Sequence, residues 1–299
     1  MTTGSTGQRS GDVVSGYVTE QVRQIRVNDG LVRRDAPESV HDMRVATRRL
    51  RSALTTFRPV FRGAAVRPLG AELVWLSGRL GGARDAQVLR ERLFDAVGDQ
   101  ASGGLDVAAV LRRVDAGTAD SLRRAHDQLV AAMSSDRYRH LLTGLDGLTG
   151  ARAYSSRATH PAGEILTHRT ARAYSTLATL VDAAGRADGP DRDRALHDAR
   201  KAAKRARYAG EALTGPCGPP AVRFAAAMKA VQANLGEHQD SIAARAYLED
   251  LAGRETSPAT AYVIGHLHAL EQVRGDRAVE RFEASWRAAR KKSLRCWLR

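Results

Sequence analysis

The sequence predicts an all-α protein built from two similar helical units, and three observations support this. Apolar residues recur three and four positions apart along almost the whole chain, which is the spacing of one helix face. A clear example is the series Leu69, Leu73, Leu76 and Leu80. Alternating runs of β-branched residues, which are typical of strands, are absent. The third observation is that one basic, helix-like segment occurs twice, which indicates a duplicated unit.

Clusters of glycine and proline divide the chain into about ten to twelve predicted helices joined by short connections. The predicted breaks fall at residues 35–37, 81–82, 101–104, 147–150, 160–161, 189–190, 215–220 and 256–258. The first ten residues are small and polar, so we expect a disordered N-terminus over residues 1–10. Residues 291–299 are rich in lysine and arginine, and we expect them to form a disordered basic C-terminal tail.

The composition indicates a cytoplasmic protein with a polyanionic partner. The 299 residues carry a formal net charge of +14, so nucleic acid, chains of inorganic phosphate and an acidic membrane surface are all candidates. The two cysteines, Cys217 and Cys296, are far apart and indicate neither a disulfide framework nor a zinc site. The chain has no secretory signal pattern and no apolar run of about 18 residues, so we expect no membrane insertion.

The internal repeat consists of two basic segments, each followed by a second matching segment. Residues 41–51, HDMRVATRRLR, return as HDARKAAKRAR at residues 197–207, an offset of 156 residues. Farther along, LGGARDAQVLRERL, beginning at Leu80, is echoed by LGEHQDSIAARAYL, beginning at Leu235, at an offset of 155 residues. Two matching blocks at nearly one spacing indicate a duplicated helical unit. We assign repeat one to about residues 11–150 and repeat two to about residues 160–290.

Each basic segment predicts a helix with one cationic face and one apolar face. Successive helical residues are about 100° apart, so the histidine and arginines of residues 41–51 fall within roughly 160° of arc. Arg44 and Arg48 are four positions apart, and like charges at this spacing repel by roughly 0.2–0.5 kcal/mol. No acidic residue follows Asp42 until Glu72. A solvated face usually carries acidic partners, so the repeated pattern favours a preformed anion site, with a solvated surface as the alternative.

The repeated segments also resemble the CHAD domain, the conserved histidine α-helical domain. The stretches that carry the resemblance are ESVHDMRVATRRLRSALTTF, ALHDARKAAKRARYAGEAL, LGGARDAQVL and LGEHQDSI. We assign the domain to residues 11–290. The resemblance implies two four-helix repeats related by pseudo-twofold symmetry, which enclose a basic cavity that binds inorganic polyphosphate.

By position, the resemblance implies which side chains of this chain bind polyphosphate. The first repeat contributes His41, Arg44, Arg48, Arg49, Arg51 and Arg84. The second repeat contributes His197, Arg200, Lys201, Lys204, Arg205, Arg207 and Tyr208. Val45 in the first repeat stands where Lys201 stands in the second, so the two halves need not contribute equally. Many relatives also carry a triphosphate tunnel (CYTH) domain with a Glu-x-Glu-x-Lys segment; none is present in this sequence, which resembles a stand-alone binding domain.

Two other classes of function remain open. A nucleic-acid-binding helical protein would use the same charge through phosphate contacts, but the aromatic content of 5% leaves few residues for base stacking. A metal-dependent phosphohydrolase would need carboxylate ligands, which do not accompany the basic faces, and the common zinc, P-loop and serine hydrolase motifs are absent. We therefore expect a cytoplasmic binding protein, associated with polyphosphate granules where these form, with no catalytic residue, metal, cofactor or obligate protein partner.

Overall fold

The computed structural model describes residues 7–101 and 107–298, and these residues form nine α-helices and four short 3-10 helices with no β-strand. The α-helices are α1 (Ser10–Arg33), α2 (Ser39–Thr56), α3 (Gly63–Ala101), α4 (Ala108–Met133), α5 (Asp136–Gly147), α6 (Ala162–Ala184), α7 (Gly189–Ala212), α8 (Thr214–Ala252) and α9 (Pro258–Ala289). The predicted all-α fold is confirmed, with slightly fewer α-helices in the described residues than expected.

Most predicted breaks coincide with helix ends. Helix α1 ends at Arg33, α7 begins at Gly189 and α9 begins at Pro258. The start of α9 is capped, because the Ser257 hydroxyl accepts a hydrogen bond from the backbone N–H of Thr260 at 3.4 Å. Local turn chemistry therefore sets these boundaries, as the glycine and proline pattern predicts.

Two predicted breaks need correction, and one is not described. Helix α3 continues through Gly81 and Gly82, so the break predicted there is wrong. The flanking Leu80 and Ala83 are buried, and their packing outweighs the cost of about 1 kcal/mol for each helical glycine. At 215–220 the chain is helical except at Gly218, whose φ of 56° and ψ of −141° suit glycine and interrupt α8. The break predicted at 101–104 lies, from residue 102 on, outside the described residues.

The ordered chain begins earlier than predicted. Residues 1–6 lie outside the described residues, but Ser10 is buried and starts α1. Its backbone N–H donates a hydrogen bond to the carbonyl oxygen of His160 at 2.8 Å. This contact ties the first helix to the connection between the two repeats.

The C-terminal segment is not the disordered tail that its composition indicates. The Trp297 ring lies edge-on to the Phe224 ring, with the ring centroids 5.7 Å apart. The Arg295 guanidinium lies 4.7 Å from the centroid of the Tyr174 ring. Both aromatic partners belong to repeat two. The prediction of disorder is therefore wrong for residues 291–298, because their aromatic and cationic side chains pack on this repeat.

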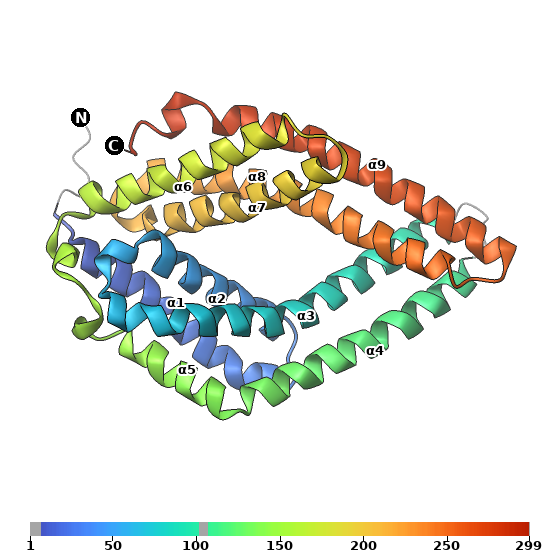
Figure 1. Cartoon of the computed structure of the whole chain (residues 1–299), viewed down its shortest axis with the longest axis horizontal. Helices are drawn as coiled ribbons and strands as arrows, with labels where there is room; N and C mark the ends of the chain where they lie inside the picture. Colours follow the sequence, from blue (N-terminus) through green and yellow to red (C-terminus); the bar gives the residue numbers. More distant parts are fainter. Residues whose placement is uncertain (1–6, 102–106, 299) are drawn as a thin grey trace.

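The duplicated sequence becomes a duplicated structure (Figure 1). Helices α1 to α4 form repeat one, α6 to α9 form repeat two, and α5 lies in the connection. The two basic segments lie in α2 and α7, and the second matching segments lie in α3 and α8. One hydrophobic core is built mainly on α1, α2, α3 and α5 and also includes buried residues of α4, α6, α7 and α8, and a second core is built on α6, α7, α8 and α9 of repeat two.

The two repeats meet at two places. Near one end of the molecule α2 contacts α7. At the other end, the second halves of α3 and α8 join parts of α4 and α9 in a third hydrophobic core (Figure 1). Between these contacts, α2 and α3 of repeat one face α7 and α8 of repeat two. None of the helices in the described ranges combines the length and low polarity needed to cross a bilayer.

Candidate anion-binding site

Helices α2 and α7 bring the basic segments of the two repeats to one cavity of about 420 Å³, here called the first basic cavity. Its basic lining residues are Arg44, Arg48, Arg51, Lys201, Lys204 and Arg205. Three of them come from α2 and three from α7. Both repeats therefore contribute equally many cations to one site, and Tyr208 also lines it.

A second basic cavity of about 490 Å³ adjoins the first, since Arg44 and Arg48 line both. The other predicted residues that line it are His41, Arg84, His197 and Arg200. The imidazole Nδ1 of His197 lies 2.9 Å from Oε1 of Gln239. The two cavities together give a basic path that runs from the rim at Arg51 and Arg205 inward to the histidines.

One aspartate in each repeat holds an inward-facing arginine. Nη1 of Arg44 donates to Oδ1 of Asp85 at 2.9 Å and to the carbonyl oxygen of Gly81 at 3.0 Å. In repeat two, Nη2 of Arg200 lies 3.9 Å from Oδ1 of Asp240. A Cβ on Gly236, the counterpart of Gly81, would lie 3.3 Å from Nη2 of Arg200. The glycine in each repeat therefore lets a guanidinium lie against the backbone of the neighbouring helix.

Arg48 and Lys204 occupy equivalent positions in the two repeats, and neither has an anionic partner. Within the described residues, neither side chain makes an ion pair or a hydrogen bond, although both line the first basic cavity. Burial, followed by the charge of Arg44, lowers the pKa of Arg48 below its usual value. Lys204 is 8% exposed, and its burial, followed by the charges of Arg200, Arg48 and Arg44, lowers its pKa to about 6. The centre of the site thus has uncompensated positive potential.

Several buried polar atoms around the cavities also have no hydrogen-bond partner, although Nη1 of Arg84 lies 3.9 Å from carboxylate oxygens of Glu38 and Glu91. In the described part of the chain, the hydroxyl oxygens of Ser52 and Ser77, Nη1 of Arg84 and Nε of Arg200 are buried without a hydrogen bond. Ser52 and Ser77 line the first basic cavity, and the two arginines line the second. Leaving such a group unsatisfied costs about 1–3 kcal/mol. A ligand with several oxygen acceptors would satisfy these donors.

Arg49 and Arg207 were predicted to bind ligand, but the structure places them outside both cavities. Nη2 of Arg49 lies 3.0 Å from Oε2 of Glu211, and Nε of Arg207 donates to Oε1 of Glu211 at 2.6 Å. Arg207 also donates to Oε1 of Gln232 at 3.1 Å. Both guanidinium groups lie within 6 Å of the Tyr208 ring centroid, at 5.9 and 5.5 Å. Glu211 therefore pairs with one arginine from each repeat and ties α2 to α7.

We expect Glu211→Gln to destabilise the protein by about 1–2 kcal/mol. The substitution keeps the shape of the side chain but leaves Arg49 and Arg207 without their shared anion, and the pair is only partly buried. Urea unfolding followed by circular dichroism measures the change. Glu280→Gln is a matched control, since Glu280 is exposed on α9, and we expect it to change stability by a few tenths of a kcal/mol at most. Equal stabilities of the two variants would contradict the role of Glu211.

Acidic residues limit the basic path beyond the second basic cavity. A third cavity of about 780 Å³ shares Val88, Arg92 and Asp240 with the second. Its acidic lining residues are Glu91, Asp95, Glu237 and Asp240. Arg92 is already paired there, because Nη2 donates to Oε1 of Glu237 at 2.8 Å and Nε donates to buried Glu271 at 2.7 Å. Basic residues therefore outnumber acidic ones in the lining of the first two cavities, and acidic residues outnumber basic ones in the third.

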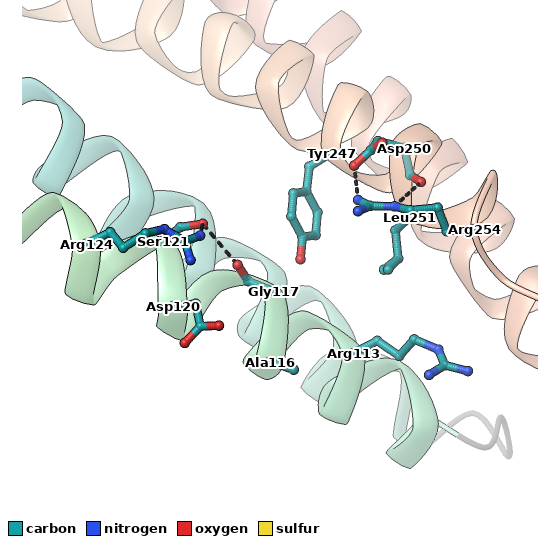
Figure 2. A pocket seen from close by; sticks show the side chains of 10 residues that line it. All are labelled: Arg113, Ala116, Gly117, Asp120, Ser121, Arg124, Tyr247, Asp250, Leu251 and Arg254. Atoms are coloured by element: carbon teal, nitrogen blue, oxygen red, sulfur yellow. Dashed lines mark hydrogen bonds and ion pairs between the residues drawn. The ribbon is translucent and has the colours of Figure 1, made fainter.

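A fourth cavity, of about 600 Å³, lies between α4 and the second half of α8 (Figure 2). Arg254 is paired there with Asp250, and Arg113 pairs with a glutamate in the α8–α9 connection. Tyr247 points from α8 toward Gly117 of α4, where a Cβ would lie 2.5 Å from the tyrosine hydroxyl oxygen. The charges of this cavity are balanced and its walls are fixed by packing, so it lacks the uncompensated potential of the basic cavities.

The residues that sequence reasoning missed are the polar neighbours of the basic ones. Ser52, Thr55 and Ser77 line the first basic cavity. Asp85 and Asp240 pair with Arg44 and Arg200, which line the second. The two aspartates could have been found, since both lie in the second repeated segment at equivalent positions. The serines and the threonine have no sequence signal. Among the described residues, no group of three or more histidine, cysteine or carboxylate side chains has an arrangement that could hold a metal ion.

The fold and the cavities define a class of all-α proteins in which two pseudo-symmetric repeats surround a basic site. The family model described as the CHAD domain matches residues 16–249. The chain belongs to the CHAD domain family, and the resemblance noted in the sequence is thereby confirmed.

Two relatives and two solved structures are similar to this chain. The uncharacterized proteins MT2285 and Rv2226, from two strains of Mycobacterium tuberculosis, are each 34% identical over 288 residues, which is 94% of this chain. The chain spans 53% of the length of each of these relatives. PptA from Streptomyces chartreusis is 23% identical and superimposes with a TM-score of 0.78 over 94% of this chain and 100% of its own. The CHAD domain from the plant Ricinus communis is also 23% identical, with a TM-score of 0.65 over 98% of this chain and 93% of that domain. These two structures share the fold.

Proposed function

We propose that this protein binds inorganic polyphosphate in the two basic cavities and does not hydrolyse it. The observation that carries the proposal is that Arg48 and Lys204, one from each repeat, line one cavity without an anionic partner. A site with an unpaired buried guanidinium, a buried amine without an anionic partner and unsatisfied buried donors is suited to a ligand that supplies many anionic oxygens. The CHAD family resemblance implies the same ligand.

The geometry favours a thin, linear polyanion. The basic residues line cavities between helices, and a chain of phosphates can enter at the rim and extend inward past Arg44 and Arg48. Guanidinium groups bind phosphate oxygens in a bidentate manner, whereas lysine acts as a point charge. In a cell that stores polyphosphate in granules, such binding would place the protein at those granules in the cytoplasm.

Nucleic acid is the second candidate, because its phosphates would be attracted by the same charge. Lys204 is buried and Arg44 and Arg48 are half-buried between helices, which argues against a duplex, because a duplex needs basic groups on an accessible surface or on an element that enters a groove. A hydrolase would need a nucleophile or a metal to activate water. The residues lining the first basic cavity supply cations and hydroxyl groups, and no carboxylate is among them.

The proposal is tested by titrating the protein with polyphosphate chains of increasing length and with duplex DNA at equal phosphate concentration. We expect affinity for polyphosphate to rise steeply with chain length, because a longer chain engages cations of both repeats at once. We also expect one long chain per protein molecule, a steep fall of affinity with salt and no phosphate release.

Three results would contradict the proposal. Equal affinity for DNA would favour the nucleic-acid function. Two independently bound chains with shallow length dependence would contradict a site shared by the repeats. Phosphate release that depends on added metal and disappears in His41→Ala would favour a metal-dependent phosphohydrolase.

A further inference from the structure

Lys204 is the most buried cation of the site, and its surroundings are mostly positive. It lies on α7 one turn beyond Arg200, which is on the same helix. From α2, Arg44 and Arg48 face it, and from α8 the Asp240 carboxylate does. The equivalent position in repeat one is Arg48, which stays charged under all ordinary conditions. Only a lysine at this position can change its charge when the surroundings change.

We propose that Lys204 is uncharged in the ligand-free protein at neutral pH and takes up a proton from solution as polyphosphate binds. The inference rests on the proposed function and adds to it how the site recognises dense negative charge. The proton passes from buffer acid to Nζ of Lys204, and no other bond is formed or broken. Lys204 is thereby a specificity-determining residue, because its charge appears only when the ligand supplies an opposing one.

The proton uptake follows from a change in the surroundings of the Lys204 amine when polyphosphate binds. Without ligand, burial and three neighbouring guanidinium groups disfavour the ammonium form and lower the pKa of Lys204 to about 6. The Asp240 carboxylate acts in the opposite direction, but its effect is smaller than that of burial and of each of the three guanidinium groups. A bound phosphate chain brings several anionic oxygens beside the amine, which favours the ammonium form.

The sign of the pH dependence follows from linkage. Below about pH 6 Lys204 is already charged, so its contribution to affinity is constant. Above that pH Lys204 must take up a proton from solution for each ligand that binds. Affinity therefore falls as the pH rises, by up to about tenfold per pH unit. The fall ends where the amine of the complex itself loses its proton. His41 and His197 also line the second basic cavity and can exchange protons, so the assignment depends on variants of Lys204.

Calorimetry at pH 7.5 in buffers of different ionisation enthalpy measures the number of protons taken up when long-chain polyphosphate binds. We expect wild type to take up about one proton more than Lys204→Met and Lys204→Arg. Lys204→Arg carries a permanent charge, so we expect it to bind without this proton and with an affinity that varies less between pH 7 and 9. Lys229→Met is the matched control, since Lys229 is exposed on α8 and lines neither basic cavity, and it should take up as many protons as wild type.

The outcomes separate this inference from the proposed function. Binding with equal proton uptake in wild type and Lys204→Arg would overturn the role of Lys204 and leave polyphosphate binding intact. Wild type that binds polyphosphate with no proton uptake would do the same, without need of any variant. Failure of wild type to bind polyphosphate at all would overturn the proposed function itself.

Discussion

Replacing Arg44 and Arg48 together with glutamate should weaken polyphosphate binding at least about 100-fold. Each arginine lines both basic cavities, and one charge-assisted contact contributes about 1.5–3 kcal/mol, where 1.4 kcal/mol corresponds to tenfold. The new carboxylates would also repel the ligand. The helix should persist, because buried Met43 and Leu50 on the opposite face of α2 are unchanged. Calorimetric titration and circular dichroism measure the two effects.

A control variant with the same change of net charge separates the effect of local contacts on affinity from the effect of overall charge. Arg67 and Arg223 are suitable, since they stand 156 residues apart on α3 and α8, are exposed and line neither basic cavity. Reversing both to glutamate should reduce affinity only through the weaker long-range attraction, and this loss should vanish at high salt. If both double variants lose affinity equally, overall charge and not the basic cavities explains binding.

Replacing Lys204 with methionine should stabilise the ligand-free protein by on the order of 2–4 kcal/mol at pH 7, since one pKa unit corresponds to about 1.4 kcal/mol. The pKa of Lys204 is lower in the folded protein, at about 6, than in the unfolded chain. Between that pH and the usual lysine range, the unfolded chain binds the additional proton, so wild-type stability rises with pH. Below about pH 6 both states are protonated and the full cost of burying the ammonium remains.

The free energy of unfolding measured in urea from pH 5 to pH 10 checks this sign. We expect the advantage of Lys204→Met to be largest at the acidic end and to shrink as the pH rises. Lys229→Met should follow the wild-type profile throughout, because Lys229 is exposed. An advantage that is independent of pH would indicate improved packing by methionine and would contradict a cost of charge burial.

Much of the fold can be predicted from local pattern because helices form from residues close in sequence. The apolar spacing in α3 and the proline that starts α9 give helix type and boundary directly. The pattern fails where long-range packing outweighs local preference. Gly81 and Gly82 predict a break, yet α3 stays helical at both positions because the residues around them are buried. The prediction of a disordered C-terminal tail fails for the same reason, because Trp297 packs on Phe224, which is distant in sequence.

The candidate site shows where the sequence by itself is sufficient. The duplicated segments identify α2 and α7, and their helical period places the cations on one face of each. Arg44, Arg48 and Lys204 could therefore be named without coordinates. The second repeated segment also contains Asp85 and Asp240, which pair with Arg44 and Arg200.

Only the tertiary structure decided which cations line the basic cavities and which pair with an acidic residue. Arg49 and Arg205 are equivalent in sequence, as are Arg51 and Arg207. Yet Arg51 and Arg205 line the first basic cavity, whereas Arg49 and Arg207 both pair with Glu211. The physical reason is that helical periodicity fixes the direction of a side chain on its own helix, but the group it meets belongs to another helix, placed by the packing of the whole chain.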